Sequence, residues 1–276
     1  MKKKINLKHK INKDFIGIYK ACNNRFWYSC GSYLIDGKKY QYDKEMLGKQ
    51  MLLYNLAKKS NYVLEIGVYM GHSILIMLAS NPKLSITGID IDKRFSPKAI
   101  DYLKKKYLKS DLKFILGDSI NTLSDLIEKN HKFDLFHIDG DHKSLKIFNE
   151  IVACTKLSKT NKMKILFDDV DMMWSLERSL TKAFQVKKYI KPKSKYPNLY
   201  LEIKLTKMNI FKFKLFFYFY YLFELPGIIF HSFKSLIRKL LLIFIGKKLC
   251  NDLGKFILNY FTNNYLISFG KKLKNI

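Results

Sequence analysis

The sequence predicts an α/β protein built on a Rossmann-like, doubly wound sheet that is mostly parallel and ends in an antiparallel hairpin. Short apolar runs rich in β-branched residues alternate with stretches of helical spacing through the middle of the chain, and this alternation is typical of parallel βαβ units. After the last of these helices, two further apolar runs flank a proline-containing connection, which favours a hairpin. A content of 48% hydrophobic residues is ample for a buried core.

Each predicted strand of the parallel part is short enough to be buried on both faces. Along the chain, these strands are expected at residues 62–66, 85–90, 112–116, 133–138 and 164–167. Helical spacing of apolar residues predicts crossover helices at residues 73–79, 97–107, 120–128, 145–157 and 171–182. A helix at 46–57 is expected to cover the sheet edge, and the hairpin strands are expected at 184–190 and 199–205.

Composition divides the 276 residues into three segments. Residues 1–45 show no clear period and are expected either to form a lid or to pack on the rest. Residues 46–206 carry the α/β pattern. Residues 207–276 form a basic, aromatic-rich helical extension with twelve Lys or Arg and two acidic residues. Such helices can lie in a membrane interface, so we expect peripheral membrane contact through residues 209–261, with packing as a homodimer element as the alternative.

The formal net charge of +28 would suit a polyanionic partner. The basic residues are nearly all Lys and are spread among Asn and Ile, so biased amino-acid usage explains much of the excess, and no specific nucleic-acid partner is predicted. The N-terminus lacks the apolar core of a secretory signal, and the four cysteines lack the spacing of a zinc site or disulfide framework. These features favour a cytoplasmic, reducing compartment.

The sharpest local signal is the turn that follows the first predicted strand. It runs from Glu65 through Gly67 to Gly71 and then into a helix that begins near Ser73. Glycines allow the backbone to approach a ligand closely. A dinucleotide fingerprint would carry a further glycine where Tyr69 stands, so the turn favours a ligand without a diphosphate.

Acidic residues also end the second and third predicted strands. Asp90 lies where a carboxylate can accept both hydroxyls of a ribose. Asp118, followed by Ser119, suits the exocyclic amine of adenine. Ligands of open α/β sheets gather at the carboxyl ends of the strands, so the three motifs together predict a ligand that contains adenosine.

Through these three motifs the sequence resembles the class I S-adenosylmethionine-dependent methyltransferases over roughly residues 46–205. The resemblance implies S-adenosylmethionine as the cofactor. It places the methionine part, the ribose and the adenine at residues from all three strand ends: Glu65, Gly67, Gly71 and Ser73 for methionine, Asp90 for ribose, and Asp118 with its neighbour Ser119 for adenine.

A cluster of acidic residues follows the fourth and fifth predicted strands. Asp139 ends one strand and the pair Asp168 and Asp169 ends the next, so their carboxylates are expected to converge. Oxygen ligands of this kind favour Mg²⁺, which would acidify a coordinated hydroxyl. His142 is the candidate base. The alternatives are that Asp139 helps to hold the cofactor and that Asp168 caps the next helix.

The Asp139 to His142 loop and the Asp168–Asp169 pair resemble the metal-dependent small-molecule O-methyltransferases, in particular the macrocin-type sugar methyltransferases of the Methyltransferase domain 24 type. The resemblance implies that Asp139, Asp168 and Asp169 hold the cation and that His142, beside Asp139, is the catalytic base. The predicted function is metal-assisted O-methylation of a small hydroxylated acceptor such as a sugar or glycan component. The alternative is a catalytically silent Rossmann-like protein that serves as a membrane or assembly adaptor.

Overall fold

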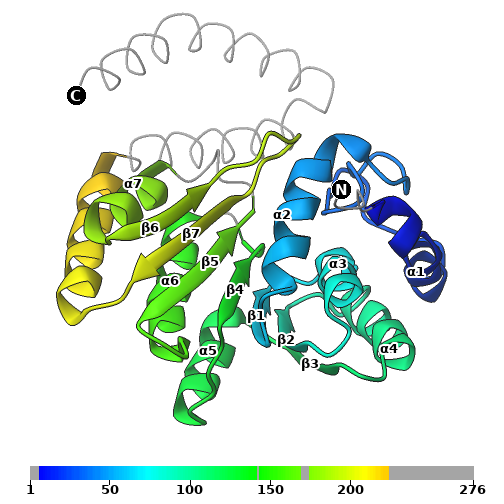
Figure 1. Cartoon of the computed structure of the whole chain (residues 1–276), viewed down its shortest axis with the longest axis horizontal. Coiled ribbons are helices and arrows are strands. Elements are labelled where there is room, and N and C mark those ends of the chain that lie inside the picture. The colour runs from blue at the N-terminus through cyan, green and yellow to red at the C-terminus, as the bar shows by residue number, and fades with distance from the viewer. Residues whose placement is uncertain (1–5, 142, 169–173, 224–276) are drawn as a thin grey trace, which may run out of the picture. The chain divides into compact units, whose positions relative to one another are not determined.

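A computed structural model describes residues 6–141, 143–168 and 174–223. Its centre is a seven-stranded sheet with the order β3-β2-β1-β4-β5-β7-β6 (Figure 1). The strands are β1 Tyr62–Ile66, β2 Ser85–Asp90, β3 Asp111–Leu116, β4 Leu135–Ile138, β5 Lys162–Phe167, β6 Val186–Ile190 and β7 Leu199–Lys204. Strands β1 to β5 pair in parallel, whereas β7 pairs antiparallel with both β5 and β6. The predicted fold class is confirmed, including the hairpin.

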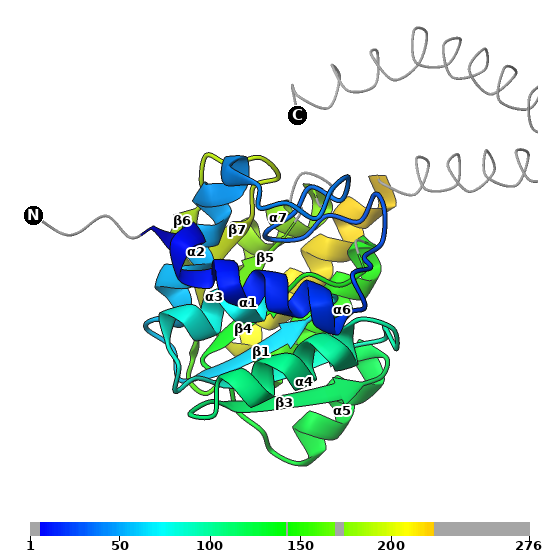
Figure 2. The same cartoon turned by 90° about the vertical axis from the view of Figure 1, so that its right-hand side faces the viewer.

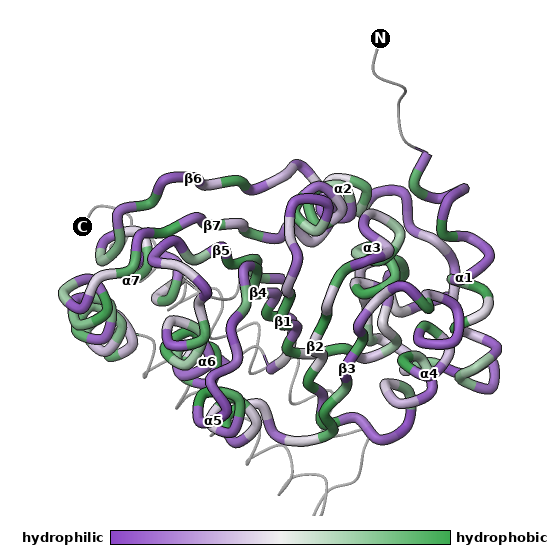
Figure 3. Tube along the Cα trace, turned by 60° about the horizontal axis from the view of Figure 1, so that its bottom comes forward, coloured by the Kyte–Doolittle hydropathy of each residue, from purple (hydrophilic) through white to green (hydrophobic). Residues whose placement is uncertain are grey.

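Helices cover both faces of this sheet (Figures 1 and 2). One face carries α1 Leu7–Ala21, α2 Leu47–Ala57, α3 His72–Ser80 and α4 Ser96–Lys106, with the short 3₁₀ helix η1 Lys44–Met46 before α2. The other face carries α5 Ser119–Glu128, α6 Ser144–Leu157 and α7 Trp174–Ala183. Figure 3 shows the apolar central strands between the two layers of helices. The hydrophilic residues of these helices lie on the side away from the sheet.

Helix α1 lies in the segment where the sequence showed no clear period. Its buried apolar residues Leu7, Ile11, Phe15 and Ile18 recur every three or four positions, which is the spacing of one helix face. Four lysines stand among the other positions of the helix, so its overall composition hides this stripe. The helix packs against α3 and α4, so the N-terminal residues contribute to the same core as the sheet.

A final described helix covers residues 207–223. Phe213 and Phe217 are buried on one of its faces, and the Phe217 ring stacks on Phe148 of α6 with a centroid distance of 4.0 Å. Within the described parts of the chain, no helix is long and apolar enough to cross a bilayer. The remainder of the extension, including most of the expected membrane-contacting segment 209–261, lies outside the described residues.

Candidate active site

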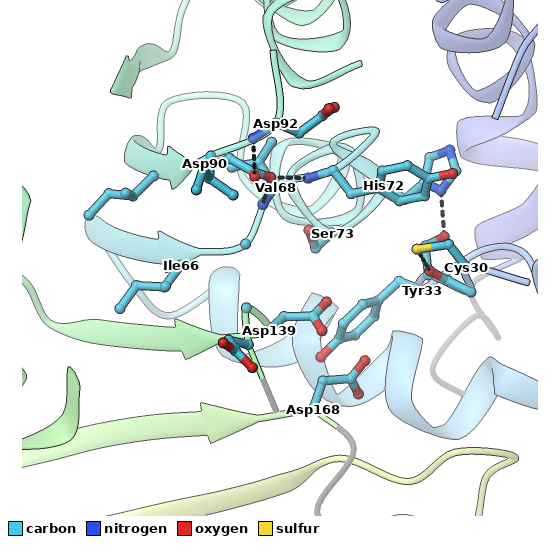
Figure 4. A pocket seen from close by; sticks show the side chains of 18 of the residues that line it. Cys30, Tyr33, Ile66, Val68, His72, Ser73, Asp90, Asp92, Asp139 and Asp168 are labelled. Carbon is cyan, nitrogen blue, oxygen red and sulfur yellow. Dashed lines mark hydrogen bonds between the residues drawn. The ribbon is translucent and has the colours of Figure 1, made fainter. Parts of the chain in front are cut away.

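A cavity of about 730 Å³ opens where the five parallel strands end. Seven of the residues predicted from the sequence line it: Gly67, Ser73, Asp90, Asp118, Ser119, Asp139 and Asp168. Figure 4 shows Asp139, Tyr33 and Asp168 on one side of the cavity and Asp90 and Asp92 on the other. Glu65 and Gly71 are not among its lining residues. His142 and Asp169 lie outside the described residues.

The turn after β1 requires its first glycine for two reasons. Gly67 has a φ of +89°, a left-handed conformation that is costly for residues with a side chain. A Cβ atom at this position would also lie 2.0 Å from the backbone oxygen of Asp139. The contact arises because β1 and β4 are neighbours and Asp139 donates its backbone N–H to Ile66 at 2.8 Å. The cofactor turn and the first acidic residue therefore share one wall.

Glu65 lies behind this turn in a fully buried hydrogen-bond network. Its Oε1 accepts a hydrogen bond from the Ser73 hydroxyl and lies 3.3 Å from Nδ1 of His137, while its Oε2 has no partner. Nε2 of His137 lies 2.8 Å from the hydroxyl of Tyr33, which also accepts from Asn198 at 3.1 Å. The network thus links the cofactor turn to the N-terminal segment and to the start of β7.

Asp90 holds the cofactor turn in place. Its Oδ2 accepts the backbone N–H groups of Val68 and Tyr69 at 2.7 and 2.6 Å and the hydroxyl of Ser96 at 3.0 Å. Its Oδ1 accepts the N–H of Asp92 at 2.8 Å. Oδ1 therefore accepts one hydrogen bond where Oδ2 accepts three, so Oδ1 is the oxygen more open to a further donor. Its role as a ribose ligand stays a prediction.

The tip of β3 forms the far end of the cavity. Asp118 caps α5, because its Oδ1 accepts the N–H groups of Ile120 and Asn121 at 2.9 and 3.4 Å. Its Oδ2 lies 3.3 Å from Nζ of Lys146. The hydroxyl of the next residue, Ser119, donates to Oε1 of Glu150 at 2.6 Å. Glu150 lines the cavity and was not singled out from the sequence.

The two described carboxylates of the acidic cluster come from adjacent strand ends. Residues Ile138 and Phe167 are paired in register, so Asp139 and Asp168 follow them side by side. Burial and the nearby Asp168 and Asp139 carboxylates raise the pKa of the Tyr33 hydroxyl well above its usual range. Within the described ranges, no group of three or more His, Cys, Asp or Glu side chains could hold a metal ion.

Lys49 of α2 supplies a positive charge to this cluster. Its Nζ donates to both oxygens of Asp168, at 2.8 and 3.1 Å, and only 3% of its side chain is exposed. The same Nζ lies 4.6 Å from the centroid of the Tyr33 ring. The sequence predicts Lys49 within the helix at 46–57 but indicates no role for it. A usable signal was its position four residues before Leu53, on the apolar face of that helix.

Aromatic and histidine side chains attach the N-terminal segment to the cofactor turn. Nδ1 of His72 lies 2.6 Å from the Ser32 hydroxyl, and its Nε2 lies 2.9 Å from the Tyr40 hydroxyl. Burial lowers the pKa of His72 to about 3, so the ring is neutral and structural at physiological pH. The backbone N–H of Trp27 donates to the Tyr69 hydroxyl at 2.8 Å. The segment forms one wall of the cavity.

Comparisons with known proteins find similar sequences for the central region. Residues 44–189 match a family model described as O-methyltransferase. An Arabidopsis thaliana protein named among the caffeoyl-CoA O-methyltransferases is 33% identical over 88 residues, which are 32% of this chain and 38% of that protein. The caffeoyl-CoA O-methyltransferase of Stellaria longipes is 28% identical over 109 residues, which are 38% of this chain and 45% of that protein. The matches therefore span less than half the length of these relatives.

Solved structures show the same architecture. The O-methyltransferase TomG from Streptomyces achromogenes, which is involved in tomaymycin synthesis and was solved with S-adenosylmethionine, superposes with a TM-score of 0.52 and 14% identity. The superposition covers 70% of this chain and 90% of that chain. At this level of identity the similarity shows a shared fold alone.

Proposed function

The chain belongs to the O-methyltransferase family, and from this premise we propose that it transfers the methyl group of S-adenosylmethionine to a hydroxyl of a small acceptor, such as a sugar or glycan component. The observation that carries the proposal is a cavity that joins the glycine turn after β1 to the carboxylates of Asp139 and Asp168. Family membership does not favour the alternative of a catalytically silent adaptor.

The acceptor would bind at the acidic end of the cavity. That region is lined by polar side chains: Asp139, Asp168, Lys49, Tyr33 and Tyr196. Such polar groups suit an acceptor rich in hydroxyls. Methyl transfer breaks the carbon–sulfur bond of the cofactor and forms a carbon–oxygen bond, while the hydroxyl loses its proton. We assign Asp139 to orient the hydroxyl and receive this proton, and the Lys49–Asp168 pair to hold the adjacent wall in place.

A divalent cation, Mg²⁺, is part of the proposal. The oxygens of Asp139 and Asp168 are donors of the type that Mg²⁺ takes, and Asp169 would be the third carboxylate. Asp139 would contribute one oxygen to the cation and keep the other to receive the proton. When bound, such a cation lowers the pKa of a coordinated hydroxyl. Since the Lys49 ammonium donates to both oxygens of Asp168, the cation would have to displace it there.

The proposal predicts that Asp139→Asn lowers the rate of methyl transfer by about 100-fold or more, because the variant loses the proton acceptor. Its affinity for S-adenosylhomocysteine should stay within about 3-fold of the native value, because the cofactor turn is kept. Release of S-adenosylhomocysteine would be measured against monosaccharides, nucleotide sugars and catechols, with Mg²⁺ or with a chelator. Asp125→Asn, an equivalent change at an exposed position of α5, is the matched control. An acceptor methylated equally well by both variants would contradict the role of Asp139.

We also propose that the helix at residues 207–223 contacts an anionic lipid surface. Opposite its buried face it presents a stripe of apolar side chains that are more than half exposed: Met208, Phe211, Leu215, Tyr218 and Phe219. Exposed lysines, Lys212 and Lys214, flank the stripe. Aromatic residues beside basic ones are typical of helices that lie in a membrane interface.

The double variant Phe211→Ser/Phe219→Ser is expected to reduce binding to vesicles of phosphatidylserine and phosphatidylcholine by at least about 10-fold, since each aromatic ring contributes roughly 1.5–3 kcal/mol when it leaves water. Co-sedimentation with the vesicles measures the fraction of protein that is bound. Leu108→Ser, which alters a side chain that is 85% exposed elsewhere, should bind like the native protein. A native protein that ignores the vesicles but sediments as a dimer would instead support the homodimer alternative.

A further inference from the structure

The far end of the cavity is built to receive a flat base with hydrogen-bonding edges. Beyond Asp90 the lining continues through Ile91 to residues 117–119 at the tip of β3, with Glu150 of α6 beside them. The Ile91 side chain is 71% exposed although it is apolar, so it offers a face against which a ring can pack. The inference drawn from this region rests on S-adenosylmethionine being the cofactor, as in the proposed function.

Asp118 already has a partner on each of its carboxylate oxygens without a ligand. Its Oδ1 already accepts two backbone N–H groups as the cap of α5, and its Oδ2 faces the ammonium of Lys146. A helix cap that is removed or redirected costs about 1 kcal/mol. The residue therefore has a complete structural role in the absence of any ligand.

Glu150 has the opposite character. The side chain is fully buried and lines the cavity, and its Oε1 is held by the Ser119 hydroxyl. Its Oε2 has no hydrogen-bond partner. Buried polar atoms are nearly always paired, and an unpaired one is destabilising. An N–H donor supplied by a ligand at this end of the cavity would satisfy this atom.

We propose that Glu150, and not Asp118, accepts the hydrogen bond of the exocyclic adenine amine and thereby selects an adenosyl cofactor. The Ser119 hydroxyl orients the carboxylate through Oε1, which leaves Oε2 for the amine. A hypoxanthine base carries an oxygen in place of the amine. That oxygen would face the Glu150 carboxylate as a second acceptor, so an inosyl cofactor is rejected.

The charges around Glu150 agree with this assignment. Burial raises the pKa of Glu150 to about 7. The Ser119 hydroxyl and Lys146 lower this pKa, whereas the nearby carboxylates of Asp141 and Asp118 raise it to a smaller extent. The Cys154 thiol, one turn further along α6, is also buried. Because an amine donor stabilises the ionised carboxylate, cofactor binding should release a proton near pH 7, and affinity should increase as the pH rises from 6 to 8.

Calorimetric titration with S-adenosylhomocysteine and with S-inosylhomocysteine tests the proposal without an acceptor. The native protein is expected to prefer the adenosyl compound by about 10- to 100-fold, the range of a hydrogen bond to a charged group. Glu150→Gln should reduce this ratio to within about 3-fold, because the amide can accept from the amine or donate to the hypoxanthine oxygen. Asp118→Asn, the matched control at the alternative position, should keep the native ratio.

Each outcome separates this inference from the proposed function. A ratio that collapses in Asp118→Asn and survives in Glu150→Gln would overturn the assignment while leaving the cofactor intact. A native protein that binds neither compound would overturn the proposed function itself. Proton release on binding can be measured with the native protein alone, by titration in buffers of different ionisation enthalpy. If no proton were released at pH 7, this result would also count against Glu150. Folding of Glu150→Gln is checked at pH 8, where loss of an ionised buried carboxylate should not destabilise the protein.

Discussion

Replacing Lys49 with methionine is expected to lower the free energy of unfolding by about 3–5 kcal/mol, the usual cost of removing one partner of a buried ion pair. Methionine keeps most of the volume of the lysine stem but donates no hydrogen bond. The Asp168 carboxylate, only 5% exposed, would lose the ammonium that donates to both of its oxygens. Urea denaturation at pH 7 measures the difference.

Two comparisons show whether this loss comes from the unpaired carboxylate. Lys113→Met removes an ion pair with Asp111 in which both side chains are more than half exposed, and it should cost less than about 1 kcal/mol. The double variant Lys49→Met/Asp168→Leu should recover most of the lost stability, because an apolar pair can replace a buried ion pair at little cost. If Lys49→Met were no more destabilising than Lys113→Met, the pair would have no structural importance.

Gly67→Ala is expected to lower the affinity for S-adenosylhomocysteine by at least about 100-fold, which is the effect of displacing binding groups by about 1 Å. The new Cβ would lie 2.0 Å from the backbone oxygen of Asp139, and the φ of +89° is unfavourable for alanine. The strand tips must separate, so the cofactor turn and Asp139 both move. Calorimetric titration of the purified variant measures the loss.

Gly117, which also lines the cavity, provides the control within the same site, because its alanine variant adds a methyl group to the wall without a backbone clash. Its Cβ would lie 3.3 Å from the Thr122 hydroxyl oxygen, and the backbone there does not have a positive φ. This variant should bind S-adenosylhomocysteine within about 5-fold of the native protein, since a side-chain contact can relax where a backbone contact cannot. Native-like binding by Gly67→Ala would show that the shared wall between the turn and Asp139 is not required.

The parallel part of the fold could be predicted because its signals are local. Strands such as β1 and β2 are short, apolar and bounded by turn residues, and the β6–β7 hairpin is marked by the prolines between its strands. Helix α1 could not be recognised in the same way. Its apolar stripe is narrow, and the lysines between the apolar positions give the segment the composition of a solvated tail.

The candidate site was predictable only where one strand end defines it. Asp90 and Asp118 were found because each lies at the carboxyl end of a predicted strand, and both line the cavity. Lys49 and Glu150 were missed because their partners are distant in sequence: Lys49 meets Asp168 across 119 positions and Glu150 meets Ser119 across 31. Only the packing of α2 and α6 onto the sheet brings these pairs together. A helix pattern identifies the buried face but does not say which polar residue on it has a partner.

The contacts that attach the N-terminal segment also limit which of its residues can change to alter the preference for an acceptor. Tyr33, Leu34 and Ile35 are completely buried, and Ser32 and Tyr40 hold His72. Residues 29–31, by contrast, contribute to the cavity wall while remaining at least partly accessible to solvent. New acceptor preferences could therefore arise, in evolution or in a directed library, through residues 29–31, whereas changes at residues 33–35 would compromise folding before they altered chemistry.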